Sequence, residues 1–451
     1  MDLLAPVSRH LVAPLHGLKE RSPHLRYARF YGATQWWPPE RLYAYRWARL
    51  KQVLHYAFEH SEFHRRRFRA IGVEPADIRD PDDLRRLPRL SKEEVRDQWD
   101  QILVPAAINA GHITKETSGS TGVPLRITWE AAAAAHKRAL TIRHNRWAGY
   151  DVGDPVGLIW GDIEAPRALR SRLRRALLDR FVVLDSQHLT AQAMESFAES
   201  IRRARIRCLL AQAQPLSLFA EFVHEKGLDD LPIETVIPTG MMLHARQRQF
   251  MEKVLSWRVF DRYGAEETSV IASECEAHEG LHICAEGLWL EVVRGDRAAA
   301  PGKEGELLVT DLVNRALPLI RYEIGDVVVP SAADCPCGRT LPRFERVSGR
   351  VADCITSPEG FVVSGIAITD HITRIPGIQQ LQVVQDMLDH LQFRIVRSRA
   401  WSQTSMDLLG ELVGRMFGER MRFECLFVPE IPPEPGGKYR FSISSVTHGI
   451  V

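Results

Sequence analysis

The interpretation of this chain rests on the stretch Thr117-Ser118-Gly119-Ser120-Thr121-Gly122-Val123-Pro124, within ITKETSGSTGVPLRITWE. Its two glycines carry no Cβ atom, so the backbone can turn tightly and approach a ligand closely. Four hydroxyl side chains and the backbone N–H groups can converge on an anion such as a nucleotide phosphate. The spacing is not that of a Walker loop, because no lysine follows Gly122. The alternative is an ordinary surface turn rich in serine, threonine and glycine, and the rest of the chain decides between the two.

The composition is that of a soluble globular protein. With 451 residues, 45% of them hydrophobic and 26% charged, the chain is too long for one core, and roughly two to four domains are expected. A net charge of +2 gives no electrostatic reason to expect nucleic acid or an acidic membrane as a partner. No apolar run approaches the ~20 residues of a membrane span. Because the first residues do not form a signal peptide and the seven cysteines do not form a disulfide scaffold, we expect a cytoplasmic protein.

Three parts of the chain differ in their predicted secondary structure. Residues 1–105 are mainly helical, and we assign them to packing within a large domain. Strands and helices alternate in the first half of residues 106–352, which predicts an α/β domain with a largely parallel sheet, whose ligands bind at the carboxyl ends of the strands. The second half of this part consists of strands broken by turns. Residues 353–451 follow the order strand, strand, helix, strand and have the size of a small α+β domain.

Two later motifs carry chemistry that fits a nucleotide. In Arg262-Tyr263-Gly264-Ala265-Glu266-Glu267-Thr268, an aromatic ring can stack on a planar base and a carboxylate can hold Mg²⁺. In Leu319-Ile320-Arg321-Tyr322-Glu323-Ile324-Gly325-Asp326, an apolar strand ends in a predicted Gly-Asp turn, where Asp326 can accept hydrogen bonds from the vicinal hydroxyls of a ribose. Each motif taken alone is more often an ordinary loop.

Two further stretches concern the last part of the chain. Ser348-Gly349-Arg350-Val351-Ala352-Asp353 has the composition of a turn and is a candidate linker. Near the C-terminus, Pro432-Pro433-Glu434-Pro435-Gly436-Gly437 precedes Lys438, and this loop would hold the lysine exposed on a mobile lid.

These stretches, taken in order, resemble the core motifs of the acyl-adenylate-forming enzymes: TSGSTGVP, YGAEE, RYEIGD, SGRVAD and PGGKYR. Within that superfamily the chain is similar to the phenylacetate–CoA ligase branch, which includes capsule-biosynthesis-associated and coenzyme F390 synthetase-like relatives. HSEFHR at residues 60–65, LPRLSK at 87–92 and CPCGR at 335–339 support this. The resemblance covers nearly the whole chain. It implies an α/β fold with a large N-terminal adenylate-forming domain, whose nucleotide- and acid-binding core is residues 106–352, and a C-terminal lid domain of residues 353–451.

The resemblance also implies roles for the matching residues. The phosphate-binding loop comprises Thr117, Ser118, Gly119, Ser120, Thr121 and Gly122, with Ser118 to Gly122 on the β- and γ-phosphates of ATP. Tyr263, beside Gly264, stacks on adenine, Glu267 holds Mg²⁺, Asp326 binds the ribose hydroxyls, Arg350 supports the ribose or phosphate, and Asp353 lies at the hinge. Lys438 approaches the carboxylate and the α-phosphate during adenylation, where its positive charge stabilises developing negative charge. The lid then rotates and removes Lys438 for the second half-reaction.

The chain departs from the family pattern at two positions. Val123 stands where the loop often carries lysine, so one phosphate contact is absent or comes from elsewhere. Glu266 stands where serine or threonine is usual, which leaves open whether Glu266 or Glu267 binds Mg²⁺. Both departures are the support for a rival interpretation, a nucleotide-binding module that has lost catalysis.

The cysteines allow a metal hypothesis. Cys275, Cys335 and Cys337, with His278 or His282, offer three thiolates and an imidazole, a complete tetrahedral zinc set. The alternative is a set of free cytoplasmic thiols. Because some relatives in this branch look to carry a structural zinc, the resemblance favours zinc over free thiols, in a closed site with a structural role. We take Cys275, His282, Cys335 and Cys337 as the ligands, and His278 competes with His282 for the fourth place.

The expected function is therefore ATP-dependent adenylation of a carboxylic acid, aromatic by resemblance, to acyl-AMP, followed by transfer to the thiol of CoA. An amine, a hydroxyl or a carrier-protein thiol is the alternative acyl acceptor. The expected cofactors are ATP and Mg²⁺, with CoA and structural Zn²⁺ as further expectations. The expected partners are small molecules, with neither nucleic acid nor membrane. The identity of the acid and the oligomeric state, with a homodimer among the alternatives, stay open.

Overall fold

The structure is a computed structural model of the 451-residue chain. It describes residues 2, 4–108, 111–117, 125–161, 174–186, 189–350, 355–359, 362–363, 368, 371–372, 375–432 and 441–446. Among the residues named above, Ser118–Gly122, Val123, Asp353 and Lys438 lie outside these ranges, and Thr117 and Arg350 are described by their backbone alone.

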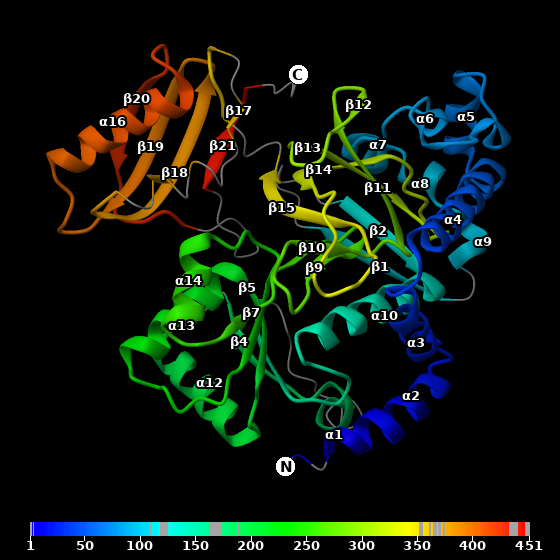
Figure 1. Ribbon diagram of the computed structural model, residues 1–451, viewed down its shortest axis with the longest axis horizontal. Coiled ribbons are helices and arrows are strands. Elements are labelled where there is room, and N and C mark those ends of the chain that lie inside the picture. The colour runs from blue at the N-terminus through cyan, green and yellow to red at the C-terminus, as the bar shows by residue number, and fades with distance from the viewer. Residues whose placement is uncertain are drawn as a thin grey trace.

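Helices form the first hundred residues (Figure 1). They are α1 (Leu4–Val7), the π-helix η1 (Ser8–Val12), α2 (Ala13–Lys19), α3 (His24–Thr34), α4 (Pro39–His60), α5 (Glu62–Ala70), the 3-10 helix η2 (Pro75–Asp77), α6 (Pro81–Leu84), α7 (Lys92–Asp97), α8 (Trp99–Ile102) and α9 (Pro105–Ile108). The apolar residues of α4 recur at helical spacing and are buried against the sheet residue Trp289. Helix α7 begins at a capping box, in which the side chains of Ser91 and Glu94 each accept a hydrogen bond from the other residue's backbone N–H.

A parallel sheet of five strands has the order β4-β3-β5-β6-β7. The strands are β3 (Val156–Trp160), β4 (Phe181–Asp185), β5 (Cys208–Gln212), β6 (Thr235–Thr239) and β7 (Arg258–Val259). Helices α12 (Ala191–Ala204), α13 (Ala213–Glu225) and α14 (Ala245–Lys253) share one apolar cluster with it, and the π-helix η3 (Arg175–Asp179) precedes β4. The parallel α/β arrangement predicted from the alternation of strands and helices is confirmed.

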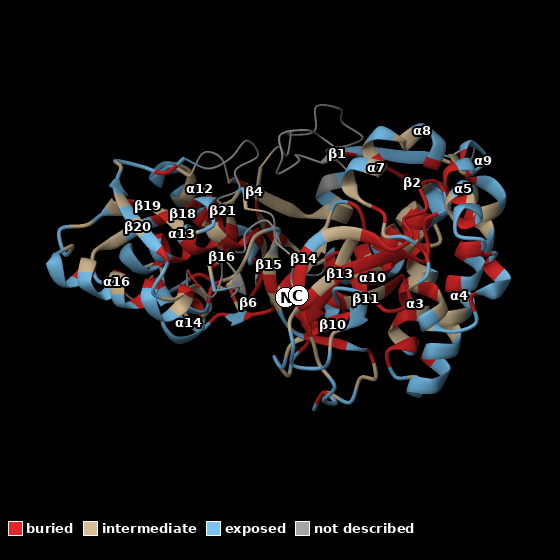
Figure 2. Cartoon of the chain, turned by 90° about the horizontal axis from the view of Figure 1, so that it is seen from above, coloured by how far each residue is buried: buried red, intermediate tan, exposed pale blue. Residues whose placement is uncertain are grey.

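A second, antiparallel sheet has the order β12-β11-β13-β14-β15-β10-β9-β8. Its strands are β8 (Arg262–Ala265), β9 (Ser269–Glu274), β10 (Leu281–Ile283), β11 (Leu288–Arg294), β12 (Arg297–Ala298), β13 (Gly305–Asp311), β14 (Tyr322–Pro330) and β15 (Arg343–Arg350). Helix α10 (Ala131–Trp147) buries its apolar residues in the same cluster as β9, β10, β13, β14 and β15. The hairpin of β1 (His112–Thr117) and β2 (Leu125–Glu130) forms a separate antiparallel pair. Buried residues concentrate in these strands and on the inner faces of the helices (Figure 2).

Two sequence predictions about local structure are wrong. The Gly-Asp pair at Gly325 and Asp326 does not end a strand, because β14 continues to Pro330. Its ladder with β13 shifts register between Glu323 and Val327, and Gly325 has φ +84°, so the pair lies in a β-bulge. Similarly, residues 348–350 of the predicted linker belong to β15, where Gly349 has φ +113°. Both errors arise because glycine permits a bulge within a strand as readily as a turn.

The C-terminal part has its own sheet and core. The strands β18 (Ile378–Met387), β19 (His390–Arg397), β20 (Arg422–Phe427) and β21 (Ser442–Ser444) pair in the order β20-β19-β18-β21, and α16 (Gln403–Phe417) packs on them. A short ladder of β16 (Ile355–Thr356) and β17 (Val362–Val363) precedes them. Figure 1 shows this unit apart from the N-terminal helices. The predicted fold class, α/β with a small C-terminal α+β unit, is confirmed. In the described part of the chain, no helix is both long and apolar enough to cross a bilayer.

A buried ion pair joins α3 and α10 to the loop before β11. The guanidinium of Arg143 lies 2.5 Å from a carboxylate oxygen of Glu286, and the Thr34 hydroxyl donates to the same oxygen at 2.5 Å. Both charged side chains are almost fully buried. Breaking one half of such a pair leaves an uncompensated charge in a medium that solvates it poorly.

Replacement of Arg143 by Met should therefore lower the free energy of unfolding by about 3–5 kcal/mol. Arg146→Met is the matched control on the same helix, since Arg146 pairs with Asp151 at 3.0 Å but is partly exposed, and it should cost less than about 1 kcal/mol. Urea titration of both variants measures the difference, and equal losses would contradict a special role for the buried pair.

Candidate functional site

Two tyrosine–carboxylate hydrogen bonds tie the β8–β9 turn to β14. The Tyr263 hydroxyl, on β8, donates to Asp326 Oδ2 at 2.5 Å, and the Tyr322 hydroxyl, on β14, donates to Glu267 Oε1 at 3.0 Å. Strand β8 lies at one end of the sheet, with β15, β10 and β9 between it and β14, so the sheet must curl for these contacts to form. Three residues predicted from two separate motifs, Tyr263, Glu267 and Asp326, therefore lie in one place.

The backbone of Arg350 also belongs to this group. In the ladder between β14 and β15, Arg350 is the partner of Asp326. Gly264 lies beside Tyr263 in β8, and a Cβ atom there would come within 2.8 Å of the carbonyl oxygen of Ser269. Glycine is therefore needed at this position for β8 to pack closely on β9.

The structure separates the two carboxylates that the sequence left as alternatives. Glu267 is buried, with Tyr322 on one side and the Lys92 ammonium 3.9 Å away. Glu266 is exposed and pairs at 3.2 Å with Lys115 of β1. Glu267 is thus the carboxylate that shares the site with Asp326, whereas Glu266 points toward the hairpin.

The hairpin fixes the two ends of the glycine-rich stretch. Thr117 ends β1, Leu125 begins β2, and the two residues are partners in the antiparallel ladder. The Nε1–H of Trp129, on β2, donates to the carbonyl oxygen of Glu267 at 3.2 Å. The hairpin that carries the stretch is therefore attached directly to the β8–β9 turn.

The carboxyl ends of the parallel strands form a second part of the site. Trp160 ends β3, Gln212 ends β5, and Gly240 follows β6. A Cβ atom on Gly240 would lie 3.7 Å from the Trp160 ring and 3.9 Å from the Gln212 side chain, so the glycine leaves space between them. Gln212 is buried, and its Oε1 has no hydrogen-bond partner among the described residues. A buried acceptor without a partner at a strand end suits a ligand that donates a hydrogen bond.

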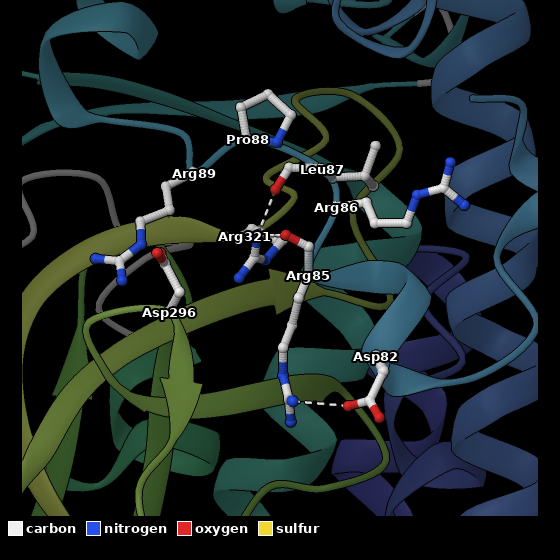
Figure 3. A pocket seen from close by; sticks show the side chains of 8 residues that line it. All are labelled: Asp82, Arg85, Arg86, Leu87, Pro88, Arg89, Asp296 and Arg321. Atoms are coloured by element: carbon white, nitrogen blue, oxygen red, sulfur yellow. Dashed lines mark hydrogen bonds and ion pairs between the residues drawn. The ribbon is translucent and has the colours of Figure 1, made fainter. Parts of the chain in front are cut away.

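A cavity of about 450 Å³ lies away from these residues (Figure 3). Its lining comprises Asp82, Arg85, Arg86, Leu87, Pro88, Arg89, Asp296 and Arg321. The guanidinium of Arg321 binds Glu291 and backbone carbonyls, and Arg85 pairs with Asp82 at 2.6 Å. Because these cations are already paired and none of Tyr263, Glu267 and Asp326 lines the cavity, we do not place the candidate site there.

Three cysteines and one histidine meet at the end of the antiparallel sheet. Cys275 follows β9, His282 is in β10, and Cys335 and Cys337 are in the loop between β14 and β15. Their ligand atoms all lie within 4.8 Å of one another. The Cys275 and Cys335 sulfurs are 3.7 Å apart, and Cys337 Sγ is 3.4 Å from His282 Nε2. A tetrahedral zinc with Zn–S bonds of about 2.3 Å separates its sulfurs by about 3.8 Å, so the residues fit that ion.

The protonation of His282 and Cys337 also suits a metal, whereas burial raises the pKa of the Cys275 and Cys335 thiols. Burial lowers the pKa of His282 to about 4, so its ring is neutral at pH 7. Its Nδ1 contacts the carbonyl oxygen of Leu341 at 3.1 Å, which leaves Nε2 toward the sulfurs. Burial raises the pKa of the Cys337 thiol, but hydrogen bonds with Arg339, Cys335 and Cys275 together bring that pKa below its usual value. The alternative His278 instead contacts Glu274 at 3.3 Å.

Sequence reasoning missed Lys92, Tyr322 and Gln212. Lys92 and Tyr322 stand inside stretches that it did quote, LPRLSK and RYEIGD, but their contacts with Glu267 depend on the curl of the sheet. Gln212 could have been found from its place at the end of a predicted strand.

Comparison with known proteins gives relatives of one kind. Residues 355–445 match the CapK C-terminal domain family. Over 380 residues the chain is 26% identical to a phenylacetate-coenzyme A ligase of Thermus thermophilus, covering 80% of this chain and 79% of that protein. It is 22% identical to protein CapK of Staphylococcus aureus, covering 81% of each. Among solved structures, 2-hydroxyisobutyryl-CoA ligase in its postadenylation state matches with a TM-score of 0.71 and 20% identity, covering 90% of each chain.

The chain therefore has the fold of the adenylate-forming CoA ligases. Within that fold, its sequence relatives are phenylacetate–CoA ligases and CapK, which confirms the resemblance inferred from the motifs.

Proposed function

We propose that this protein is an AMP-forming acid–CoA ligase. A carboxylate oxygen of the acid attacks the α-phosphorus of ATP, giving acyl-AMP and pyrophosphate. The thiol sulfur of CoA then attacks the acyl carbon, and AMP leaves. The observation that carries the proposal is the meeting of Tyr263, Glu267 and Asp326 beside the hairpin that bears the glycine-rich stretch. The similarity to phenylacetate–CoA ligases supports the same reaction.

The residues at this place have chemically distinct roles in the proposal. Tyr263 stacks on adenine while its hydroxyl holds Asp326, so that the Asp326 carboxylate is oriented to accept hydrogen bonds from the ribose. Arg350, the ladder partner of Asp326, supports the ribose or phosphate from the neighbouring strand. Residues Thr117 to Gly122 bind the phosphates through hydroxyl and N–H groups.

Glu267 is the residue we propose as the Mg²⁺ ligand. Its carboxylate is buried and oriented by Tyr322, whereas that of Glu266 is exposed and paired with Lys115. When bound, the ion would neutralise charge on the phosphates. Lys92, 3.9 Å from Glu267, is a second cation beside this position. It is a candidate for the phosphate contact that Val123 cannot make.

The acid would bind at the carboxyl ends of the parallel strands. Gly240 leaves space there between Trp160 and Gln212, and the indole offers an apolar face to the acyl group. The unpartnered Oε1 of Gln212 favours an acid whose acyl part carries a hydrogen-bond donor. The solved 2-hydroxyisobutyryl-CoA ligase named above is in complex with R3-HIB-AMP.

The experiment that tests this function is a panel of carboxylic acids, each assayed with ATP and Mg²⁺ in the presence and absence of CoA. We expect pyrophosphate release, AMP formation that depends on CoA, and an acyl-CoA product from an aromatic or hydroxy acid. Pyrophosphate release without CoA turnover would indicate that the acyl acceptor of the second step is an amine, a hydroxyl or a carrier-protein thiol. Binding of ATP with no turnover on any acid would contradict a ligase.

Lys438 supplies a separate test of the first half-reaction. We propose that its ammonium stabilises the charge that develops between the carboxylate and the α-phosphate, so Lys438→Ala should slow adenylation by about 10²–10³-fold. Its effect on the Kd for ATP should be small, because the charge is needed mainly in the transition state. Lys303→Ala, at an exposed turn, is the control and should leave the rate unchanged. An unaltered rate in Lys438→Ala would favour the nucleotide-binding module over the ligase.

We further propose that Cys275, His282, Cys335 and Cys337 hold a structural zinc. The distances between their ligand atoms and the neutral state of His282 support this. A zinc with four protein ligands would lack an open position and would hold the ends of β9 and β10 to the β14–β15 loop.

Metal analysis of the purified protein should find about one zinc per chain. Cys335→Ser should remove most of it and lower the melting temperature, because metal binding energy contributes to folding. Cys425→Ser, a half-buried thiol on β20 outside the cluster, should change neither value. A wild-type protein free of zinc after growth in zinc-supplemented medium would rule the site out.

A further inference from the structure

An apolar stripe runs along the first helical segment and faces away from the protein. Leu4, Val7, Leu11, Leu15 and Leu18 recur every three or four residues through α1, η1 and α2. Their exposed fractions lie between 47% for Val7 and 76% for Leu18. We call these five side chains the leucine face. Figure 1 shows α1 and α2 at the edge of the molecule.

The opposite side of the same segment fixes its orientation. Its small residues Ala5, Ser8 and Ala13 are buried, and the Ser8 hydroxyl donates to the carbonyl oxygen of Leu177. The Arg9 guanidinium pairs with Asp154 at 2.7 Å. A Cβ atom on Gly153 would come within 2.7 Å of Ser8, so this contact is close. The segment therefore cannot turn to bury its leucines without losing these contacts.

Basic residues outnumber acidic ones around the leucine face, where the exposed acids are Asp2 and Glu20. No aspartate or glutamate occurs between Leu4 and Lys19, whereas Arg9, His10 and His16 do. Exposed basic side chains follow on α2 and α3, at Lys19, Arg21, Arg26 and Arg29, with Glu20 as the exposed acid among them. The net charge of +2 for the whole chain conceals this local excess. Leucines beside basic residues are typical of helices that lie in the interface of an anionic bilayer.

The size of the leucine face argues against a second copy of the chain as its partner. The exposed fractions correspond to an apolar area on the order of 500 Å², large enough to mark an interaction surface. Two such faces would bury about 1,000 Å² in total, below the ~1,200 Å² at which stable protein interfaces begin. A bilayer needs no complementary surface, so the same area suffices there.

We propose that the leucine face docks this protein onto the surface of a membrane rich in anionic phospholipid. The helix would lie parallel to the bilayer with its leucines among the acyl chains and the basic residues at the headgroups. An adenylating domain held in this way would stay next to any substrate or acceptor that resides in the membrane. The docking proposal rests on α1 to α3 alone and does not depend on the proposed ligase activity.

The test is flotation of the full-length protein with vesicles of phosphatidylcholine, with and without phosphatidylglycerol. We expect binding to the anionic vesicles that weakens with salt. In the variant Leu11→Gln/Leu15→Gln/Leu18→Gln, the partition coefficient should fall by at least about tenfold. Leu218→Gln/Leu408→Gln/Leu426→Gln is the matched control, since these leucines are exposed elsewhere, and it should bind as the wild type does. Unchanged melting temperatures would show that both variants fold.

Three results would overturn the proposal. The first is failure of the wild-type protein to float with anionic vesicles, and the second is equal flotation of the wild type and the leucine-face variant. The third is a wild-type dimer, seen by analytical ultracentrifugation, that dissociates in the leucine-face variant, because a second copy would then cover the face.

Discussion

The candidate site depends on a reciprocal pair of hydrogen bonds. Tyr263 of β8 donates to Asp326 of β14, and Tyr322 of β14 donates to Glu267 beyond β8. The β8–β9 region and β14 therefore each donate one hydroxyl hydrogen bond to the other and accept one from it. Three strands lie between β8 and β14 in the sheet. Charge-assisted bonds of this kind hold a carboxylate in a fixed orientation before any ligand arrives. The curl of the sheet brings β8 and β14 close enough for these two hydrogen bonds to form.

The bulge in β14 has a part in this arrangement. Glu323 and Val327 face residues of β13 that are only two apart, so the chain between them is pushed out of the ladder. Asp326 lies in that displaced segment and is nearly buried. An uninterrupted strand would alternate its side chains strictly between two faces. The two extra residues of β14 displace this segment from the ladder with β13, and bulges of this kind are common near ligand sites.

The sequence predicted much of the fold, and the errors have a common cause. Helix α10 begins with an alanine run, whose strong helical propensity can be recognised from the sequence. The parallel sheet followed from the alternation of strands and helices. Gly325 and Gly349 were misjudged because composition does not separate a turn from a bulge. The sequence alone does not decide between His278 and His282 or between Glu266 and Glu267, because the members of each pair are close together in the chain. They differ in their contacts in the folded structure: His278 contacts Glu274 and His282 contacts Cys337, while Glu266 pairs with Lys115 and Glu267 accepts from Tyr322.

The hairpin of β1 and β2 also affects which sequence changes the fold can accept during evolution. Thr117 and Leu125 face each other across the ladder, so both ends of the stretch between them are already held close by the strands. Lengthening a loop whose ends are fixed costs little, about 0.6 kcal/mol for each doubling. Insertions or substitutions in this stretch should therefore affect the stability of the fold far less than they affect ligand binding. Because the ladder already holds Thr117 and Leu125 together, the fold sets only a weak limit on the length of the stretch between them.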